Sequence, residues 1–168
     1  MSQVFSEINK IVNVLPAKAH GDSTSNTSDI VNMANYKKCT FIVATGASAA
    51  NTPILTVLAG VSNASAATAI AYKYRTQVKA ADSETSSGDV SSVLTDATTA
   101  GFTMTTAKAG GVYIIEVDAA TVAAAGTAYD HVCIHASTGV AHAAQLYSII
   151  AVLSEPRYPQ AILQTAID

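Results

Sequence analysis

The fold is decided by the stretch Gly110-Gly111-Val112-Tyr113-Ile114-Ile115-Glu116-Val117-Asp118, which carries the clearest strand pattern in the chain. Two glycines separate it from the residues before it, and its centre is β-branched or aromatic, a composition that suits a pleated and buried surface. Side chains alternate along a strand, so Tyr113, Ile115 and Val117 are expected to share one face. The stretch therefore predicts a largely buried strand around which the sheets are built.

Two apolar runs follow this strand, at residues 129–136 and 146–153. The connections between the three are short, which favours an antiparallel meander. Residues 17–28 and 60–69 are small and polar and are interpreted as loops, and residues 119–125 as one helical turn. Further strand patterns lie upstream, at residues 29–33, 38–45, 54–59, 72–79, 90–94 and 102–105.

About eight or nine strands at these intervals predict an all-β fold, an antiparallel β-sandwich or barrel in one domain over residues 1–168. Residues 54–59 are apolar on both faces except at Thr56, which predicts a central strand. Residues 72–79 alternate, with Tyr72 facing inward and Lys73 and Arg75 on a solvated outer face. Together these patterns leave little room for helix.

The two ends of the chain differ from this pattern. Val4, Ile8, Ile11, Val12 and Leu15 match one face of a helix that Pro16 would end, so residues 1–16 form an N-terminal helix or arm. The alternative is a short helix followed by an extended arm over residues 11–15. Proline residues at 156 and 159 end regular pairing, which makes residues 156–168 a C-terminal tail.

Charge is scarce in this chain. Charged residues make up 12% of the 168 residues, with nine Lys or Arg against twelve Asp or Glu and a net charge of −3. No basic cluster is dense enough to follow a nucleic acid backbone. No apolar run is long enough to cross a membrane, and the N-terminus lacks a secretion signal, so we expect synthesis in a cytosol. Low charge also favours association, although compositional drift is an equal explanation.

One group of residues has the spacing of a metal site. His131, Cys133 and His135 alternate on one expected strand, and His142 follows a few residues later. The alternative is that this face is simply exposed or lies at a subunit contact. Cys133 and Cys39 both lie in strand-like runs and are expected to be buried thiols rather than a disulfide. No nucleophile elbow or phosphate loop is present, which predicts a protein that is not an enzyme and uses no cofactor.

Several stretches resemble a family of small structural proteins of tailed bacteriophages. The resemblance spans most of the chain, and its most specific part is Leu153-Ser154-Glu155-Pro156-Arg157-Tyr158. The histidines between His131 and His142 depart from the family pattern. The other matching stretches are Ser6-Glu7-Ile8-Asn9-Lys10-Ile11-Val12, Asn35-Tyr36, Thr40-Phe41-Ile42-Val43, Thr45-Gly46, Val112 to Ala119, Tyr129-Asp130-His131-Val132 and Tyr147 to Leu153.

The resemblance implies a capsid decoration, or cement, protein on the outer surface of a phage head. Its partner would be the major capsid protein, and its fold would be jelly-roll-like and often trimeric. The contact segments would be residues 3–15 and the tail after Pro156, both expected to lie outside the strand core. Alternatives are another virion role, such as a tail-tube, head–tail joining or fibre-associated protein, or a carbohydrate- or host-binding β-sandwich module.

Overall fold

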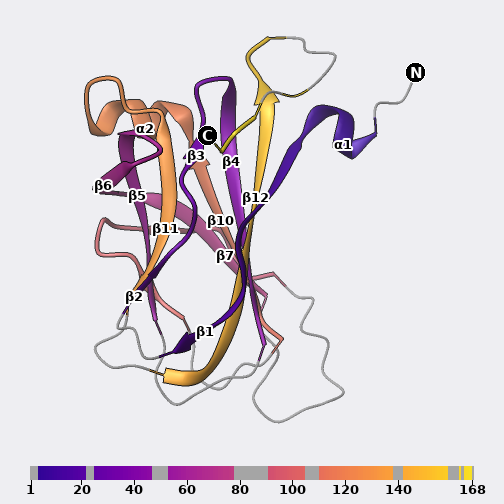
Figure 1. The fold of residues 1–168 in the computed structure, drawn as a ribbon, viewed down its shortest axis with the longest axis vertical. Coiled ribbons are helices and arrows are strands. Elements are labelled where there is room, and N and C mark those ends of the chain that lie inside the picture. The colour runs from indigo at the N-terminus through magenta and orange to yellow at the C-terminus, as the bar shows by residue number, and fades with distance from the viewer. Residues whose placement is uncertain are drawn as a thin grey trace.

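The chain forms an antiparallel β-sandwich, seen in a computed structural model that describes residues 4–21, 25–46, 53–77, 91–104, 110–137, 142–158, 163 and 165–167 (Figure 1). Sheet A has the strand order β1-β12-β4-β10-β7-β8, and sheet B has the order β2-β11-β5-β6, with β3 on β11 and β9 on β5. The elements are α1 (Phe5–Ile8), β1 (Lys10–Gly21), β2 (Ser25–Thr27), β3 (Val31–Asn32), β4 (Tyr36–Thr45), β5 (Ile54–Ser62), β6 (Ser65–Ile70), β7 (Tyr72–Gln77), β8 (Thr95–Ala97), β9 (Phe102–Thr103), β10 (Val112–Asp118), α2 (Ala119–Ala125), β11 (His131–Ser137) and β12 (His142–Pro156).

The strand order is that of a jelly roll. The chain passes from β1 in sheet A to β2 and β3 in sheet B, returns to β4, and then crosses to the hairpin of β5 and β6. It goes to sheet A for β7 and β8, to sheet B for the short β9, back to sheet A for β10, to sheet B for β11 and to sheet A for β12. These crossings are the two Greek keys of a double-sheet jelly roll, and β7 and β8 extend sheet A beyond β10.

The expected meander of the last three long strands is therefore wrong. β10 and β12 both pair with β4, whereas β11 lies in the other sheet and pairs with β5. The reason lies in the twelve residues after Asp118, where α2 contacts strands of both sheets and carries the chain from one sheet to the other. A short connection in sequence here spans the sandwich and does not form a hairpin.

The core lies between the sheets and is built by alternate side chains. Phe41, Tyr113 and Ile115 from sheet A meet Leu55 and Ile134 from sheet B, and all five are at most 1% exposed. Burying each such side chain contributes about 1.5–3 kcal/mol, which makes this layer the main source of stability. The sequence pattern predicted these faces of β4 and β10 correctly.

Two predicted loops are in fact strands. Within residues 60–69, β5 continues to Ser62 and β6 returns antiparallel to it. Within residues 17–28, β1 extends to Gly21 and β2 pairs with β11. Small polar side chains give little strand signal, but the backbone hydrogen bonds of a neighbouring strand hold them in the sheet. The weak strand expected at residues 90–94 is also displaced in its described part, residues 91–94, because the strand that pairs with β7 is β8, while residue 90 lies outside the described residues.

The N-terminal helix is shorter than expected. α1 has four residues, and β1 begins at Lys10 and runs through Pro16, which an edge strand tolerates because one side of it has no partner. The alternative prediction, a short helix followed by an extended segment, agrees with α1 and β1. However, this segment pairs with β12 and buries Val14 and Leu15, so it does not lie outside the strand core.

The C-terminal tail also reaches the core. Ala166 is 1% exposed, and its carbonyl oxygen accepts a hydrogen bond of 2.8 Å from the backbone N–H of Asn32 in β3. The expectation that everything after Pro156 lies outside the strand core is therefore wrong for this residue. Proline residues end the ladder of β12 but do not prevent later residues from packing.

Candidate interaction surface

The histidines of β11 do not assemble into a metal site among the described residues. His131 is 7% exposed and its Nδ1 lies 2.5 Å from Oδ1 of Asp130, whereas Nδ1 of His135 lies 3.0 Å from Oγ1 of Thr27. Each imidazole is thus held by a different local partner. The side chain of His142 lies outside the described residues. Both faces of β11 from His131 to Ile134 are buried, which neither sequence alternative anticipated.

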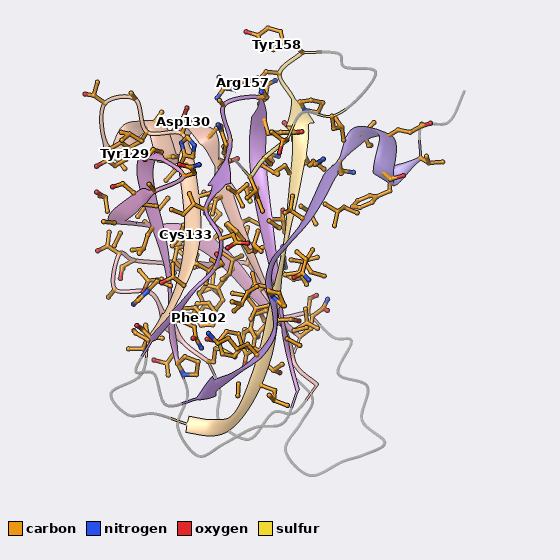
Figure 2. The ribbon with its side chains drawn as sticks, viewed as in Figure 1. Phe102, Tyr129, Asp130, Cys133, Arg157 and Tyr158 are labelled. Carbon is orange, nitrogen blue, oxygen red and sulfur yellow. The ribbon has the colours of Figure 1, made fainter. Side chains whose placement is uncertain are left out.

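The two cysteines are buried free thiols, as expected. Figure 2 labels Cys133 on β11, and its side chain is fully buried. Burial raises the pKa of Cys133 to about 11 and also raises the pKa of Cys39. A thiol with a raised pKa stays protonated near neutral pH, and only the thiolate is a good nucleophile or metal ligand. Cys133 therefore packs as a small apolar side chain.

A more unusual feature is the apolar surface at the N-terminal end. We define the N-terminal apolar patch as Val4, Phe5, Ile8 and Ile11 together with Ile150 of β12. These side chains are 57%, 59%, 37%, 50% and 37% exposed. Figure 1 shows α1 standing away from both sheets, beside the end of β12. Large apolar side chains gathered in this way mark an interaction site more often than scattered ones do.

Hydrogen bonds fix the single turn of α1. The backbone N–H of Val4 donates to Oε2 of Glu7 at 3.0 Å, which satisfies one of the free donors at the start of the helix. The backbone N–H and Nδ2 of Asn9 both donate to the carbonyl oxygen of Phe5, at 3.0 and 2.9 Å. Asn9 is itself buried. The turn is therefore preformed and holds Phe5 in solvent.

The patch continues onto the outer face of sheet A. Ile150 pairs with Ile42, and Ile42 pairs with Ile114, so three isoleucines cross the sheet side by side on the face opposite the core. Next to them, Ile11 pairs with Val152. The sequence did not single out these outer residues, because 146–153 is apolar on both faces and does not reveal which face is covered. These side chains can be recognised as one apolar surface only once the register of the strands is known.

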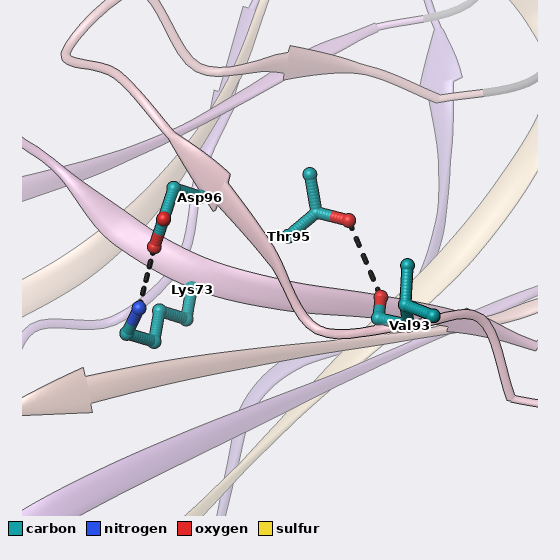
Figure 3. A network of polar contacts seen from close by, with 4 residues as sticks. All are labelled: Lys73, Val93, Thr95 and Asp96. Atoms are coloured by element: carbon teal, nitrogen blue, oxygen red, sulfur yellow. Dashed lines mark hydrogen bonds and ion pairs between the residues drawn. The ribbon is translucent and has the colours of Figure 1, made fainter.

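Charged side chains lie beside these apolar residues, with Lys38 and Glu155 at the ends of β4 and β12 near which β1 begins and Lys73 and Asp96 toward the opposite edge of sheet A. Nζ of Lys38 lies 2.8 Å from Oε1 of Glu155, and Nζ of Lys73 lies 2.6 Å from Oδ1 of Asp96 (Figure 3). These hydrogen bonds raise the pKa of Lys38 and Lys73 and lower that of Glu155. All four side chains are about half exposed or more, so solvent screens both pairs and they add little stability. The predicted solvated face at Lys73 is thus partly paired.

An open hollow of about 600 Å³ adjoins these charges. Its lining carries Lys37, Lys38 and Arg157 together with Asp118 and Glu155. Cations and anions are mixed there, which gives no preference for a ligand of one charge.

The start of the predicted C-terminal contact segment is also exposed. The backbone N–H of Arg157 donates to the carbonyl oxygen of Asn35 at 2.9 Å and so anchors the chain to the loop before β4. Tyr158 is 65% exposed and lies beyond the end of β12 (Figure 2). The two predicted contact segments therefore each present an exposed aromatic side chain, Phe5 in the first and Tyr158 in the second.

Comparison with protein-family models, curated proteins and solved structures finds no match to this chain. In the described part of the chain, none of the helices has the length and apolar character needed to cross a bilayer. A functional assignment must therefore start from the surface itself.

Proposed function

We propose that this protein is a capsid decoration protein that binds the outside of a tailed-phage head through its N-terminal apolar patch. The observation that carries the proposal is the preformed display of Phe5 and its neighbours on a protein whose described cysteines and histidines are held in local contacts. The patch exposes roughly 400 Å² of apolar side chain, within the range of the largest apolar patch on a typical soluble monomer, and such patches are often functional. The sequence resemblance to phage structural proteins supplies the shell as the partner.

The physical role of such a protein is stabilisation by binding. A ligand that binds the assembled shell and not its dissociated subunits shifts the equilibrium toward the shell. The partner is the major capsid protein, presented in many copies, and an oligomer of this chain would gain avidity by contacting several copies at once. Such a role needs a surface and no active site. The resemblance favours a trimer as that oligomer and the virion surface as its location.

The test removes the apolar side chains and leaves the rest of the fold. We expect Phe5→Ser with Ile8→Ser to weaken binding to stripped capsids by about 2–4 kcal/mol, which is roughly 30- to 1,000-fold in dissociation constant. Val93→Ser is the matched control, because Val93 is 79% exposed and precedes β8 at the opposite edge of sheet A. Its backbone carbonyl oxygen accepts hydrogen bonds from Oγ of Ser92 and from Oγ1 of Thr95, the second of which Figure 3 shows, and serine at position 93 retains that oxygen.

The readouts are cosedimentation with stripped capsids and the melting temperature of the decorated capsids. The proposal requires the wild type and Val93→Ser to bind and raise that temperature, and the double variant to do neither. Equal binding by all three proteins would remove the patch from the mechanism. A wild type that ignores capsids but polymerises into tubes would favour the tail-tube alternative.

A further inference from the structure

The sandwich has four sheet edges, and three of them carry the usual protection against pairing with another chain. β8 has three residues, and its Asp96 pairs with Lys73 of the neighbouring strand. β2 and β3 have three and two residues. β1 is long, but it contains Lys10, Pro16 and Lys18 and shifts register repeatedly against β12. Short length, charge, proline and bulges are the devices that natural edge strands use.

The fourth edge, β6, lacks two of these devices, charge and proline. Its sequence is Ser65-Ala66-Ala67-Thr68-Ala69-Ile70, six residues without charge or proline. Both register shifts against β5 lie in its turn-side half, where Ala67 has no Cα partner, and from Thr68 to Ile70 it follows β5 regularly. Among the described residues no strand other than β5 pairs with it. Its outer side therefore presents backbone donors and acceptors to a further strand.

The distribution of charge singles out the same sheet. The strands of sheet A contain ten Lys, Arg, Asp or Glu residues, and the strands of sheet B contain none. Charged residues are depleted at the centre of protein interfaces because their desolvation is costly. A second molecule can therefore approach the edge of sheet B without burying or opposing a formal charge on any strand of that sheet.

We propose that β6 pairs antiparallel with β6 of a second copy and joins the two B sheets into one. Antiparallel pairing of identical strands is two-fold symmetric, so each copy supplies the complement that the other needs, and the contact closes at a dimer. Serine and alanine side chains over Ser65–Ala67 place no bulk in the way of the ordinary strand spacing of about 4.8 Å. The contact is two-fold and differs from the threefold assembly that the sequence resemblance implies.

The test uses charge at Ala67, which is exposed and lies within the edge strand. In the register that places the two-fold axis at the middle of β6, residue 67 of the two copies lies near that axis, so Ala67→Lys and Ala67→Glu should each weaken the dimer at least tenfold through repulsion. An equimolar mixture of the two variants should restore a dimer with one chain of each kind. Ala64→Lys is the matched control, because Ala64 is exposed in the turn just before β6 and adds the same charge.

Sedimentation velocity of the purified full chain gives the mass, and circular dichroism confirms that each variant is folded. We expect dimers for the wild type, for Ala64→Lys and for the mixture, and monomers for each charged variant at position 67 alone. A wild-type monomer, or a trimer that Ala67→Lys leaves intact, overturns the proposal. No capsid is used, so this outcome is independent of the proposed function.

Discussion

Gly60→Ala should be among the most damaging single-methyl additions in this protein. A Cβ at Gly60 would lie 1.7 Å from the carbonyl oxygen of Ser65 and 2.7 Å from Cα of Ala66. Both atoms belong to the backbone of β6, so no side chain can turn away to make room. The strand itself must move by more than 1 Å to restore an ordinary contact, and the end of the β5–β6 hairpin must open.

The expected loss of stability follows from the contacts that β6 makes. Displacing it weakens backbone hydrogen bonds worth about 1 kcal/mol each and partly uncovers Ile70, which is 3% exposed and worth about 1.5–3 kcal/mol when buried. We therefore expect the free energy of unfolding to fall by about 3–5 kcal/mol. For a chain of this length the melting temperature should fall by roughly 10 °C.

Gly110→Ala is the matched control for this experiment. Gly110 has φ +74°, but a Cβ there meets no atom within 4 Å. Alanine at that position bears only the strain of a left-handed backbone, about 1–2 kcal/mol. Urea unfolding followed by circular dichroism compares the two variants. If Gly60→Ala costs no more than Gly110→Ala, the reasoning from the close approach of β5 and β6 is wrong.

Two further predictions concern the core. Ile115→Ala removes a fully buried side chain at the centre of sheet A and should lower the free energy of unfolding in urea by about 2–5 kcal/mol. Ile150→Ala on the outer face should lower it by less than about 1.5 kcal/mol. Equal losses would contradict the assignment of the two faces. Burial raises the pKa of Cys133 from 9.0 to about 11, so the thiol of the unfolded chain ionises first as pH rises. The buried thiol therefore contributes fully to the free energy of unfolding below pH 9, and this contribution is lost between pH 9 and about 11. Iodoacetamide at pH 8 should leave Cys133 unmodified in the folded protein and label it in urea, as read by mass spectrometry, and rapid labelling without urea would show that the thiol is accessible.

The sequence predicted the strands with large alternating side chains and missed those without them. β10 and β4 were placed with their buried faces because Tyr113, Ile115 and Phe41 alternate with outward residues. β6 was interpreted as a loop because serine, alanine and threonine carry almost no periodic signal. Its place in the sheet comes from the ladder with β5, a long-range interaction that local composition does not encode.

The topology and the interaction surface were likewise predicted only in part, because both depend on long-range pairing. The crossing between β10 and β11 depends on where α2 packs, which the short sequence separation did not disclose. The N-terminal residues were predicted as a contact segment from the resemblance to phage structural proteins, supported by their apolar composition. The outer isoleucines at positions 42, 114 and 150 were not, because only the register shows that they share the exposed face of adjacent strands.

The placement of charge separates two explanations of the low charge content. Compositional drift would thin the charges of both sheets alike. Sheet A instead carries ten charged residues in its 53 strand residues, a frequency that would give about five in the 29 strand residues of sheet B, which has none. A surface exposed on all sides gains solubility from charge everywhere, whereas a surface covered in an assembly loses stability from it. Part of sheet B is covered within the chain, because both faces of β11 are buried from His131 to Ile134, and the charge-pair variants at Ala67 test whether a second copy meets its remaining edge.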